Sequence, residues 1–302
     1  MTPADGLWVV VGPTAAGKSA LAVGLAQRGA GEVVSADSMQ VYRGFDIGTG
    51  KLPVVARAGV PHHLIDVVEA KEGFSAARFV ELADRAIGDI RSRARRVVVA
   101  GGTGLYVRAL LRGLFDAPPP DAEIRAEHDA VRQRDGVSAL YSRLQGVDPE
   151  AARRVDRNDF VRISRALEVV EQTGVPISEL RDEHRFATER YRARMIGIDP
   201  GRAPLRQRID QRVEEMMADG WLDEVRLLLD VGAGETHAMG ALGYRHLRAH
   251  LRGELDLAEA VRQTKRDTWR FAKRQLNWFR QEPNVEWYSS AAAALTDIGP
   301  QI

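Results

Sequence analysis

The chain of 302 residues has 43 Lys and Arg against 42 Asp and Glu, so its formal charge of +1 does not by itself indicate a nucleic-acid partner. Because it has no cysteine, disulfides, thiolate metal sites and a cysteine nucleophile are excluded. No run approaches the ~18 apolar residues of a membrane helix, and residues 1–6 do not resemble a signal peptide. We therefore expect a cytoplasmic protein without membrane contact.

Short apolar runs rich in β-branched residues occur at 7–11, 32–35, 63–68, 96–100 and 194–198, with helical patterns such as 75–94 between them. This alternation predicts an α/β fold, with a parallel sheet core of the P-loop NTPase type. Ligands of such sheets bind at the carboxyl ends of the strands. The segments that follow three of the runs are therefore expected to share one crevice: 12–19, 35–40 and 101–106.

The segment after the first run reads Gly12-Pro13-Thr14-Ala15-Ala16-Gly17-Lys18-Ser19, which fits the phosphate-binding pattern G-x-x-x-x-G-K-[ST]. Its glycines let successive amides turn toward a ligand, and the following helix adds its positive dipole end. Lys18 supplies a mobile charge, and the Ser19 hydroxyl can bind Mg²⁺. We predict a phosphate site here, with Mg²⁺ as the cofactor.

Asp37 directly follows the second run, and its carboxylate is a candidate general base. Three simpler roles stay open: a ligand to Mg²⁺-bound water, a cap of the following turn, or an acceptor for a ribose hydroxyl. Ser38 and Gln40 have polar groups that can read a base edge or satisfy the hydrogen bonds of their own loop.

The fourth run ends in Gly101-Gly102-Thr103-Gly104. A nucleoside triphosphatase favours an acidic residue at such a strand end, where it holds Mg²⁺ through water. Ala100 and Gly101 occupy that position, which argues against a motor or switch ATPase but does not exclude a small kinase.

Three consecutive prolines at 118–120 interrupt the alternation, and the chain then reads as helices and turns to about residue 190. We predict a core over 1–117 and 191–302, with a helical insertion domain over 118–190. The last part contains a glycine-rich joint at 232–243 and a long helix over 256–280. The alanine-rich stretch 291–294 is expected to fray.

The predicted helix 256–280 carries three acidic and seven basic residues. Arginines recur at every fourth position with aromatic residues between them, a composition suited to phosphate contacts and base stacking. The alternative is that the aromatic residues belong to the core and the arginines form a solvated face. The residues concerned are Arg262, Arg266, Arg270 and Arg274, with Trp269, Phe271, Trp278 and Phe279.

In their order along the chain, these motifs resemble those of the bacterial tRNA dimethylallyltransferases, also called tRNA isopentenyl-transferases. The resemblance covers nearly the whole length, and "SADSMQVYRGFDIGTGK", "AGGTGLYVRALLRGL" and "AKRQLNWFR" are distinctive of that family. Val161 departs from the pattern, since the family commonly has glutamine or arginine there. The other matching segments are "GPTAAGKS", "PHHLID", "RNDFVRISRALEV", "TGVPISEL", "RIDQRVEEMMADGWLDEV" and "AMGALGYRH".

The resemblance implies that the loop 12–19 holds the diphosphate of dimethylallyl diphosphate and not ATP. The five-carbon group is then transferred to N6 of the adenosine 3′-adjacent to the anticodon, in tRNAs that read codons beginning with U. Asp37 is the candidate base, and Lys18 with Mg²⁺ on Ser19 would stabilise the leaving diphosphate. Thr103 would bond the target base or Asp37. Arg208 and Arg212 are candidates for diphosphate contact or for surface ion pairs.

The expected partners are dimethylallyl diphosphate and the tRNA anticodon stem-loop, without a stable protein partner. The target adenosine must leave its stacked loop to react. By the resemblance, tRNA contacts fall in both predicted domains: Asp37, Ser38, Met39, Gln40, Thr103, Arg125, Arg162, Arg165, Lys273, Arg274, Gln275, Trp278 and Arg280.

Three other functions account for part of the pattern. A small-molecule kinase shares the loop and the fold, but it has no use for a basic and aromatic C-terminal helix. A prenyltransferase that acts on free adenylate does not need the helical insertion. A non-catalytic RNA-binding protein leaves Asp37 and the phosphate loop unexplained.

Overall fold

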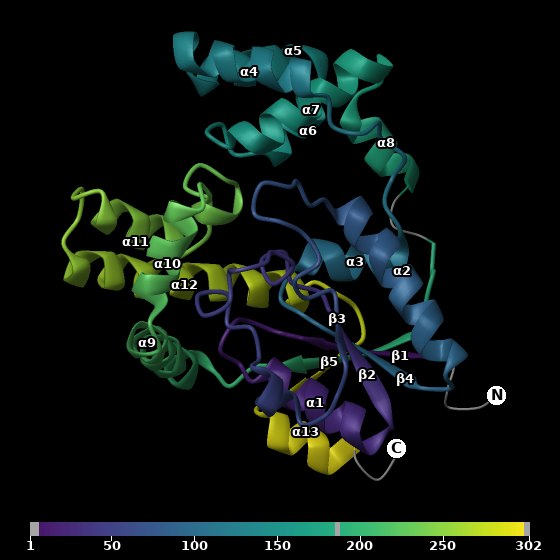
Figure 1. Cartoon of the computed structure of the whole chain (residues 1–302). Coiled ribbons are helices and arrows are strands. Elements are labelled where there is room, and N and C mark those ends of the chain that lie inside the picture. Colours follow the sequence, from purple (N-terminus) through teal and green to yellow (C-terminus); the bar gives the residue numbers. More distant parts are fainter. Residues whose placement is uncertain (1–5, 185–187, 299–302) are drawn as a thin grey trace. The chain divides into compact units, whose positions relative to one another are not determined.

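The computed structural model describes residues 6–184 and 188–298 of the chain (Figure 1). It separates into two compact units. The core unit is formed by residues 1–111 and 190–302, and the helical unit by residues 112–189. Among the described helices, none combines the length and the apolar content that a membrane crossing requires.

A parallel sheet organises the core unit, and the described residues contribute six strands to it in the order β3-β2-β4-β1-β5-β6. In the register of the central strand, Val9 lies opposite Val99 on one side and Met195 on the other. The strands are β1 (Leu7–Val11), β2 (Gly31–Ser35), β3 (His62–His63), β4 (Arg96–Ala100), β5 (Ala193–Ile198) and β6 (Val285–Tyr288).

Every residue of β1 is buried, because helices cover both faces of the sheet. Alternate residues of β1 belong to two different clusters. Val9 packs on the side of α2 (Ala76–Ser92) and α3 (Gly104–Arg112), and Val10 on the side of α1 (Lys18–Arg28) and α13 (Ala291–Ile298). This double cover explains why the first run of the sequence is apolar without alternation.

The predicted helix 75–94 is present as α2. The Ser75 hydroxyl accepts a hydrogen bond from the Arg78 amide and so caps its first turn. Phe79, Ala83 and Ile87, spaced by four, are all buried against the sheet, as an amphipathic helix requires.

The C-terminal helices of the core unit pack around a cluster that includes Trp221, Tyr244 and Phe45. The Asp256 carboxylate caps the longest of them by accepting a hydrogen bond from the Glu259 amide. These elements are α9 (Arg202–Ala218), α10 (Trp221–Asp230), η3 (Ala238–Gly240), α11 (Tyr244–Leu251) and α12 (Leu257–Arg280). A short turn, η2 (Val54–Arg57), follows β2.

Two predictions of local structure are wrong. The strand expected over 63–68 is confined to His62–His63, because Leu64 and Asp66 adopt φ values of 62° and 57° that end an extended segment. The stretch 291–294 does not fray: it begins α13, whose residues Ala294 and Ile298 are fully buried in the cluster shared with α1.

The helical unit has its own apolar core, which includes Leu140, Leu144, Ile163 and Leu167. Asp121, Asp148 and Asp159 each cap the helix that follows them. The helices are α4 (Ala122–Asp135), α5 (Val137–Val147), α6 (Pro149–Arg154), α7 (Phe160–Thr173) and α8 (Ile177–His184).

Candidate active site

A cavity of about 470 Å³ lies in the core unit, at the carboxyl ends of β1, β2 and β4. Its volume is in the range of small-molecule sites. The three loops that the sequence places together all line it. They contribute Thr14, Lys18, Asp37 and Thr103, among others, and α9 and α12 contribute Arg212 and Gln275.

The phosphate loop has the backbone that its glycines were predicted to allow. Gly12 and Gly17 adopt φ values of 139° and 105°, and a Cβ on Gly12 would lie 2.7 Å from the Ile198 carbonyl oxygen. At the start of α1, Lys18 donates from Nζ to the Pro13 carbonyl at 2.8 Å.

Burial lowers the pKa of Lys18 to about 8, with a smaller contribution from Arg212 in the same direction, while Asp37 opposes the shift. Burial also lowers the pKa of Arg212, which Asp37 again opposes. These effects show that the three charges act on one another across the cavity. An anion bound beside Lys18 and Arg212 would therefore meet positive charge that is only partly neutralised.

Neither Arg208 nor Arg212 forms a salt bridge within the described part of the chain. Arg208 donates to the Ala16 carbonyl at 3.3 Å, and Arg212 donates to the Gly50 carbonyl at 3.4 Å. Both guanidinium groups thus contact loops that line the cavity, and of the two roles left open by the sequence, diphosphate contact fits this arrangement.

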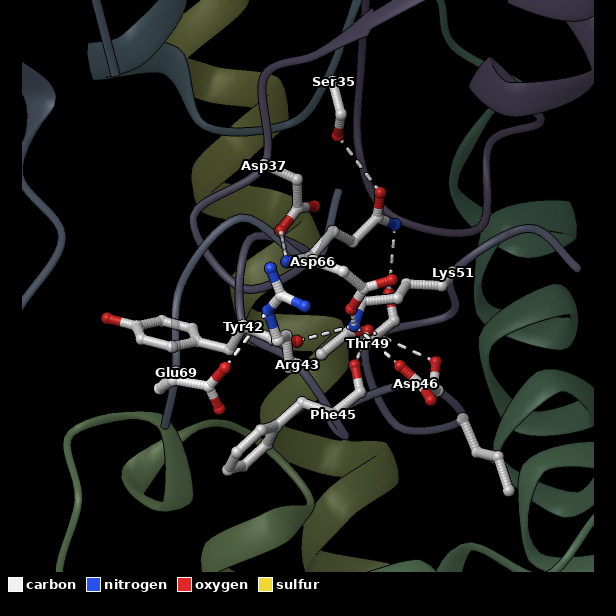
Figure 2. A network of polar contacts seen from close by, with 12 residues as sticks. Ser35, Asp37, Tyr42, Arg43, Phe45, Asp46, Thr49, Lys51, Asp66 and Glu69 are labelled. Atoms are coloured by element: carbon white, nitrogen blue, oxygen red, sulfur yellow. Dashed lines mark hydrogen bonds and ion pairs between the residues drawn. The ribbon is translucent and has the colours of Figure 1, made fainter. Parts of the chain in front are cut away.

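Asp37 supports its own loop with one of its two oxygens (Figure 2). Oδ1 accepts hydrogen bonds from the amides of Met39 at 2.8 Å and Gln40 at 3.3 Å, which is the capping role considered from the sequence. Among the described residues Oδ2 has no hydrogen-bond partner, so it is available to a ligand. The Thr103 hydroxyl accepts from the Ser38 amide at 3.0 Å and holds the same loop.

Gln40, predicted to read a base, is engaged within its loop. Its Oε1 accepts from the Ser35 hydroxyl at 3.1 Å, and its Nε2 donates to the carbonyls of Thr49 and Gly50. Its side chain therefore shapes the loop.

Gln275, predicted as a tRNA contact, is buried and connects two loops of the cavity. Its Oε1 accepts from the Thr14 amide at 2.9 Å, and its Nε2 donates to the Gly102 carbonyl at 2.9 Å. A Cβ on Gly102 would lie 2.2 Å from Nε2, so this glycine makes room for the amide. Gln275 thus joins α12 to the phosphate loop and to the loop after β4.

Two residues missed by the sequence reasoning fix the loop after β2. Glu224 on α10 accepts from the amides of Asp46, Ile47 and Gly48, and also from the Tyr244 hydroxyl. The burial of Tyr244 and its bond to this carboxylate raise the pKa of the phenol.

Lys51 is the second of these residues (Figure 2). Its side chain is 5% exposed, and Nζ contacts the Tyr42 carbonyl, Asp46 and Asp66. Among the signals in the sequence, only the motifs "GTGK" and "DGWLDEV" point to these two residues.

On α12 the arginines and aromatic residues divide between the two roles considered. Arg262 pairs with Glu259, while Arg266 and Arg270 pair with Asp267, so these three form a solvated ionic face. Phe279 is fully buried in the core. Arg274 and Phe271 line the cavity, and Lys273 is exposed. Trp278 packs under Arg108, and Arg280 pairs with Asp199 at 2.8 Å.

In the helical unit, Arg125 and Arg165 both neutralise Glu168, whose side chain is fully buried. The distances to its carboxylate are 3.0 Å from Arg125 and 2.7 Å from Arg165. Arg162 is 67% exposed and lies 3.4 Å from Asp159, so it is the most accessible of the three.

The parallel sheet, the glycine-rich loop and the cavity at the strand ends define a P-loop α/β protein with a second, helical unit. A family model described as IPP transferase matches residues 40–282. The chain belongs to the IPP transferase family, which confirms the resemblance seen in the sequence.

Curated relatives of similar length carry consistent names. The tRNA dimethylallyltransferase of Anaeromyxobacter dehalogenans is 52% identical over 281 residues, which cover 93% of this chain and 94% of that protein. The tRNA dimethylallyltransferase 2 of Syntrophus aciditrophicus is 50% identical over 283 residues, covering 93% and 91%.

Solved structures of the family share the fold. The full-length tRNA isopentenylpyrophosphate transferase of Bacillus halodurans matches with a TM-score of 0.72 at 39% identity, covering 98% of this chain and 95% of that one. A eukaryotic dimethylallyltransferase acting on tRNA matches with a TM-score of 0.78 at 27% identity, covering 98% and 77%.

Proposed function

We propose that this protein transfers the dimethylallyl group of dimethylallyl diphosphate to N6 of the adenosine 3′-adjacent to the anticodon of tRNA, and releases diphosphate. As in the family resemblance, the tRNAs are those that read codons beginning with U. The observation that carries the proposal is a cavity that brings Lys18 and Arg212, suited to an anionic leaving group, together with the Asp37 carboxylate. The names of the relatives support tRNA as the acceptor and a dimethylallyl group as the group transferred.

The phosphate loop, Lys18 and Arg212 stabilise the departing diphosphate. As the allylic C–O bond lengthens, negative charge grows on the leaving oxygen, and Lys18 with the loop amides is placed to stabilise it. Arg212 adds positive charge in the cavity, and Arg208 adds it beside the phosphate loop. Diphosphate leaves with the electron pair of the broken bond.

Ser19 is the residue that would hold Mg²⁺. This residue lines the cavity, and no cluster of three His, Cys, Asp or Glu side chains occurs among the described residues. This donor set fits an ion held mainly by substrate phosphates, which is the usual way that proteins bind Mg²⁺. The ion would neutralise charge on the leaving group.

Asp37 is the proposed base, because its Oδ2 has no hydrogen-bond partner among the described residues while Oδ1 fixes the loop. The N6 amine is a weak nucleophile, since its lone pair is delocalised into the adenine ring. As the new C–N bond forms, the N6 proton passes to Asp37 and then to solvent. Thr103 positions this step through its hydrogen bond to the Ser38 amide.

Contacts with tRNA are proposed for the exposed basic residues nearest this chemistry on α12, and for Arg162 in the helical unit. On α12 these are Lys273, Arg274 and Arg280, with Trp278 beside them. Ser38 and Met39 line the cavity, where they would meet the extruded adenine. This chemistry on tRNA is also the reason to place the protein in the cytoplasm.

One incubation tests the proposal against its rivals. The protein is mixed with dimethylallyl diphosphate, Mg²⁺ and either tRNA or AMP, and each acceptor is analysed for the added five-carbon group by mass spectrometry. Prenylated tRNA with unchanged AMP is the expected result. Prenylated AMP, or consumption of ATP with phosphate transfer to a small molecule, would refute the proposal.

A further inference from the structure

The side chains of helix α9 differ in polarity along the length of the cavity. Arg208, Arg212 and Met216 are spaced by four residues, so they follow one side of the helix over about 12 Å. Arg208 contacts the phosphate loop, Arg212 interacts with Asp37 and Lys18, and Met216 packs in the cluster that contains Trp221. Of this helix, Ile209, Arg212, Val213 and Met216 line the cavity, so the lining is apolar beyond Arg212 on the side away from the phosphate loop.

Trp221, the first residue of α10, lines the cavity, belongs to the cluster on which Met216 packs, and is 2% exposed. Its indole is held against the Tyr244 ring, edge to face, with the centroids 5.5 Å apart. Val213 and Leu242 also line the cavity, as does Arg245, whose charge is paired with Asp267. The Trp221 ring forms a fixed wall.

Two glycines make room for this indole. A Cβ on Gly48 would lie 2.1 Å from its Nε1, and a Cβ on Gly243 would lie 1.9 Å from its Cη2. The turn that contains Gly48 is itself fixed by Glu224, one helical turn after Trp221. Close contacts with these two turns thus hold the ring in place.

Hydrogen bonding by the indole nitrogen does not explain why a tryptophan occupies position 221. Nε1 is buried and has no hydrogen-bond partner among the described residues, an arrangement that costs stability relative to a purely apolar side chain. A leucine would fill an ordinary core position here without that cost and without the two glycines. The property that distinguishes tryptophan from leucine at this position is therefore the size of its ring.

We infer that Trp221 sets the length of the prenyl donor: its indole ends the apolar part of the cavity and admits a five-carbon chain but not a ten-carbon one. This inference rests on the proposed function, because it takes the diphosphate to lie at the phosphate loop. A second isoprene unit would extend into the space of the indole, which has more atoms than that unit.

Competition between two donors tests the inference. Dimethylallyl diphosphate and geranyl diphosphate are offered together with tRNA, and the ratio of the two products gives the ratio of kcat/KM. The wild-type protein is expected to prefer the five-carbon donor. In Trp221→Leu the ratio should move toward geranyl by at least about tenfold, the size of effect that a few methylene groups produce in an apolar pocket.

Two further variants keep the test interpretable. Phe79→Leu shortens an equally buried aromatic residue on the opposite side of the sheet from α1 and outside the cavity lining, and it should leave the ratio unchanged. Met216→Ala opens the same end of the cavity without removing the indole. If Trp221→Leu does not fold, this variant should still shift the ratio toward geranyl, by a smaller factor.

Three results would overturn the inference while leaving the proposed function intact. The first is equal use of both donors by the wild-type protein. The second is an unchanged ratio in the folded variants. The third is an effect confined to the KM for tRNA, which would assign the apolar end to the extruded adenine. If the wild-type protein transfers neither group to tRNA, the proposed function fails and the inference fails with it.

Discussion

The substitution Gln275→Met separates two roles for one residue of α12. The sequence places Gln275 among the tRNA contacts, whereas in the structure its amide joins Thr14 of the phosphate loop to Gly102. Methionine has nearly the same length and shape but cannot form either hydrogen bond. The variant therefore removes the connection while changing the packing little.

Its cost follows from the two bonds. Each is worth about 1 kcal/mol net, and a buried partner left without a bond costs about 1–3 kcal/mol, so the loss is about 2–4 kcal/mol. For a protein of this size, each kcal/mol lowers Tm by about 2–4 °C. We expect a Tm lower by about 5–15 °C, and weaker binding of the diphosphate donor because Thr14 is no longer held.

Thermal unfolding and titration with a non-reactive thiolo analogue of the donor measure these effects. Gln263→Met is the matched control, because Gln263 lies on the same helix and its side chain bonds only Glu259 within residues 6–184 and 188–298. It should leave both quantities near the wild-type values. The reasoning is refuted if Gln275→Met keeps wild-type Tm and donor affinity but binds tRNA more weakly.

Three other predictions concern charge. The pKa of Lys18 is lowered to about 8 in the free protein, and a bound diphosphate raises it again. Donor affinity should therefore be constant just below pH 8 and fall by up to about tenfold per pH unit above it. Calorimetry that finds the same pH dependence in Lys18→Met would contradict this. Replacing Glu224 by Gln should slow prenyl transfer and lower Tm, because the acceptor of three amides loses its charge, and Asp223→Asn on the exposed side of α10 is the control. Replacing Arg125 by Ala leaves Glu168 buried with one cation fewer and should destabilise the helical unit by about 3 kcal/mol. The double variant that also carries Glu168→Gln should recover part of this stability. A change in tRNA affinity alone would favour a contact role for Arg125.

The parts of the fold that could be predicted depend on local pattern. The β-branched runs and the spacing of Phe79, Ala83 and Ile87 specify a strand or a helix within a few residues of sequence. Once a parallel sheet is predicted, the strand ends meet by topology, so the convergence of Lys18, Asp37 and Thr103 on one cavity follows.

The parts that could not be predicted depend on distant pairings or on weak local signals. Gln275 meets Thr14 across 261 positions of sequence, and nothing near either residue indicates the other. The edge strand β6 has four residues with a glutamate among them, so it has little strand pattern. The alanines of α13 read as a frayed tail because their burial depends on α1, which the composition of the tail does not reveal.

The central claim is that one carboxylate takes the proton from the acceptor amine, and Asp37→Asn tests it most directly. The amide oxygen of asparagine can still accept from the Met39 and Gln40 amides, so the loop keeps its shape while the basic oxygen is lost. In single-turnover experiments with saturating donor and tRNA, we predict that transfer slows by about 10²–10⁴-fold while both affinities stay within a few-fold. Transfer at the wild-type rate would contradict the account.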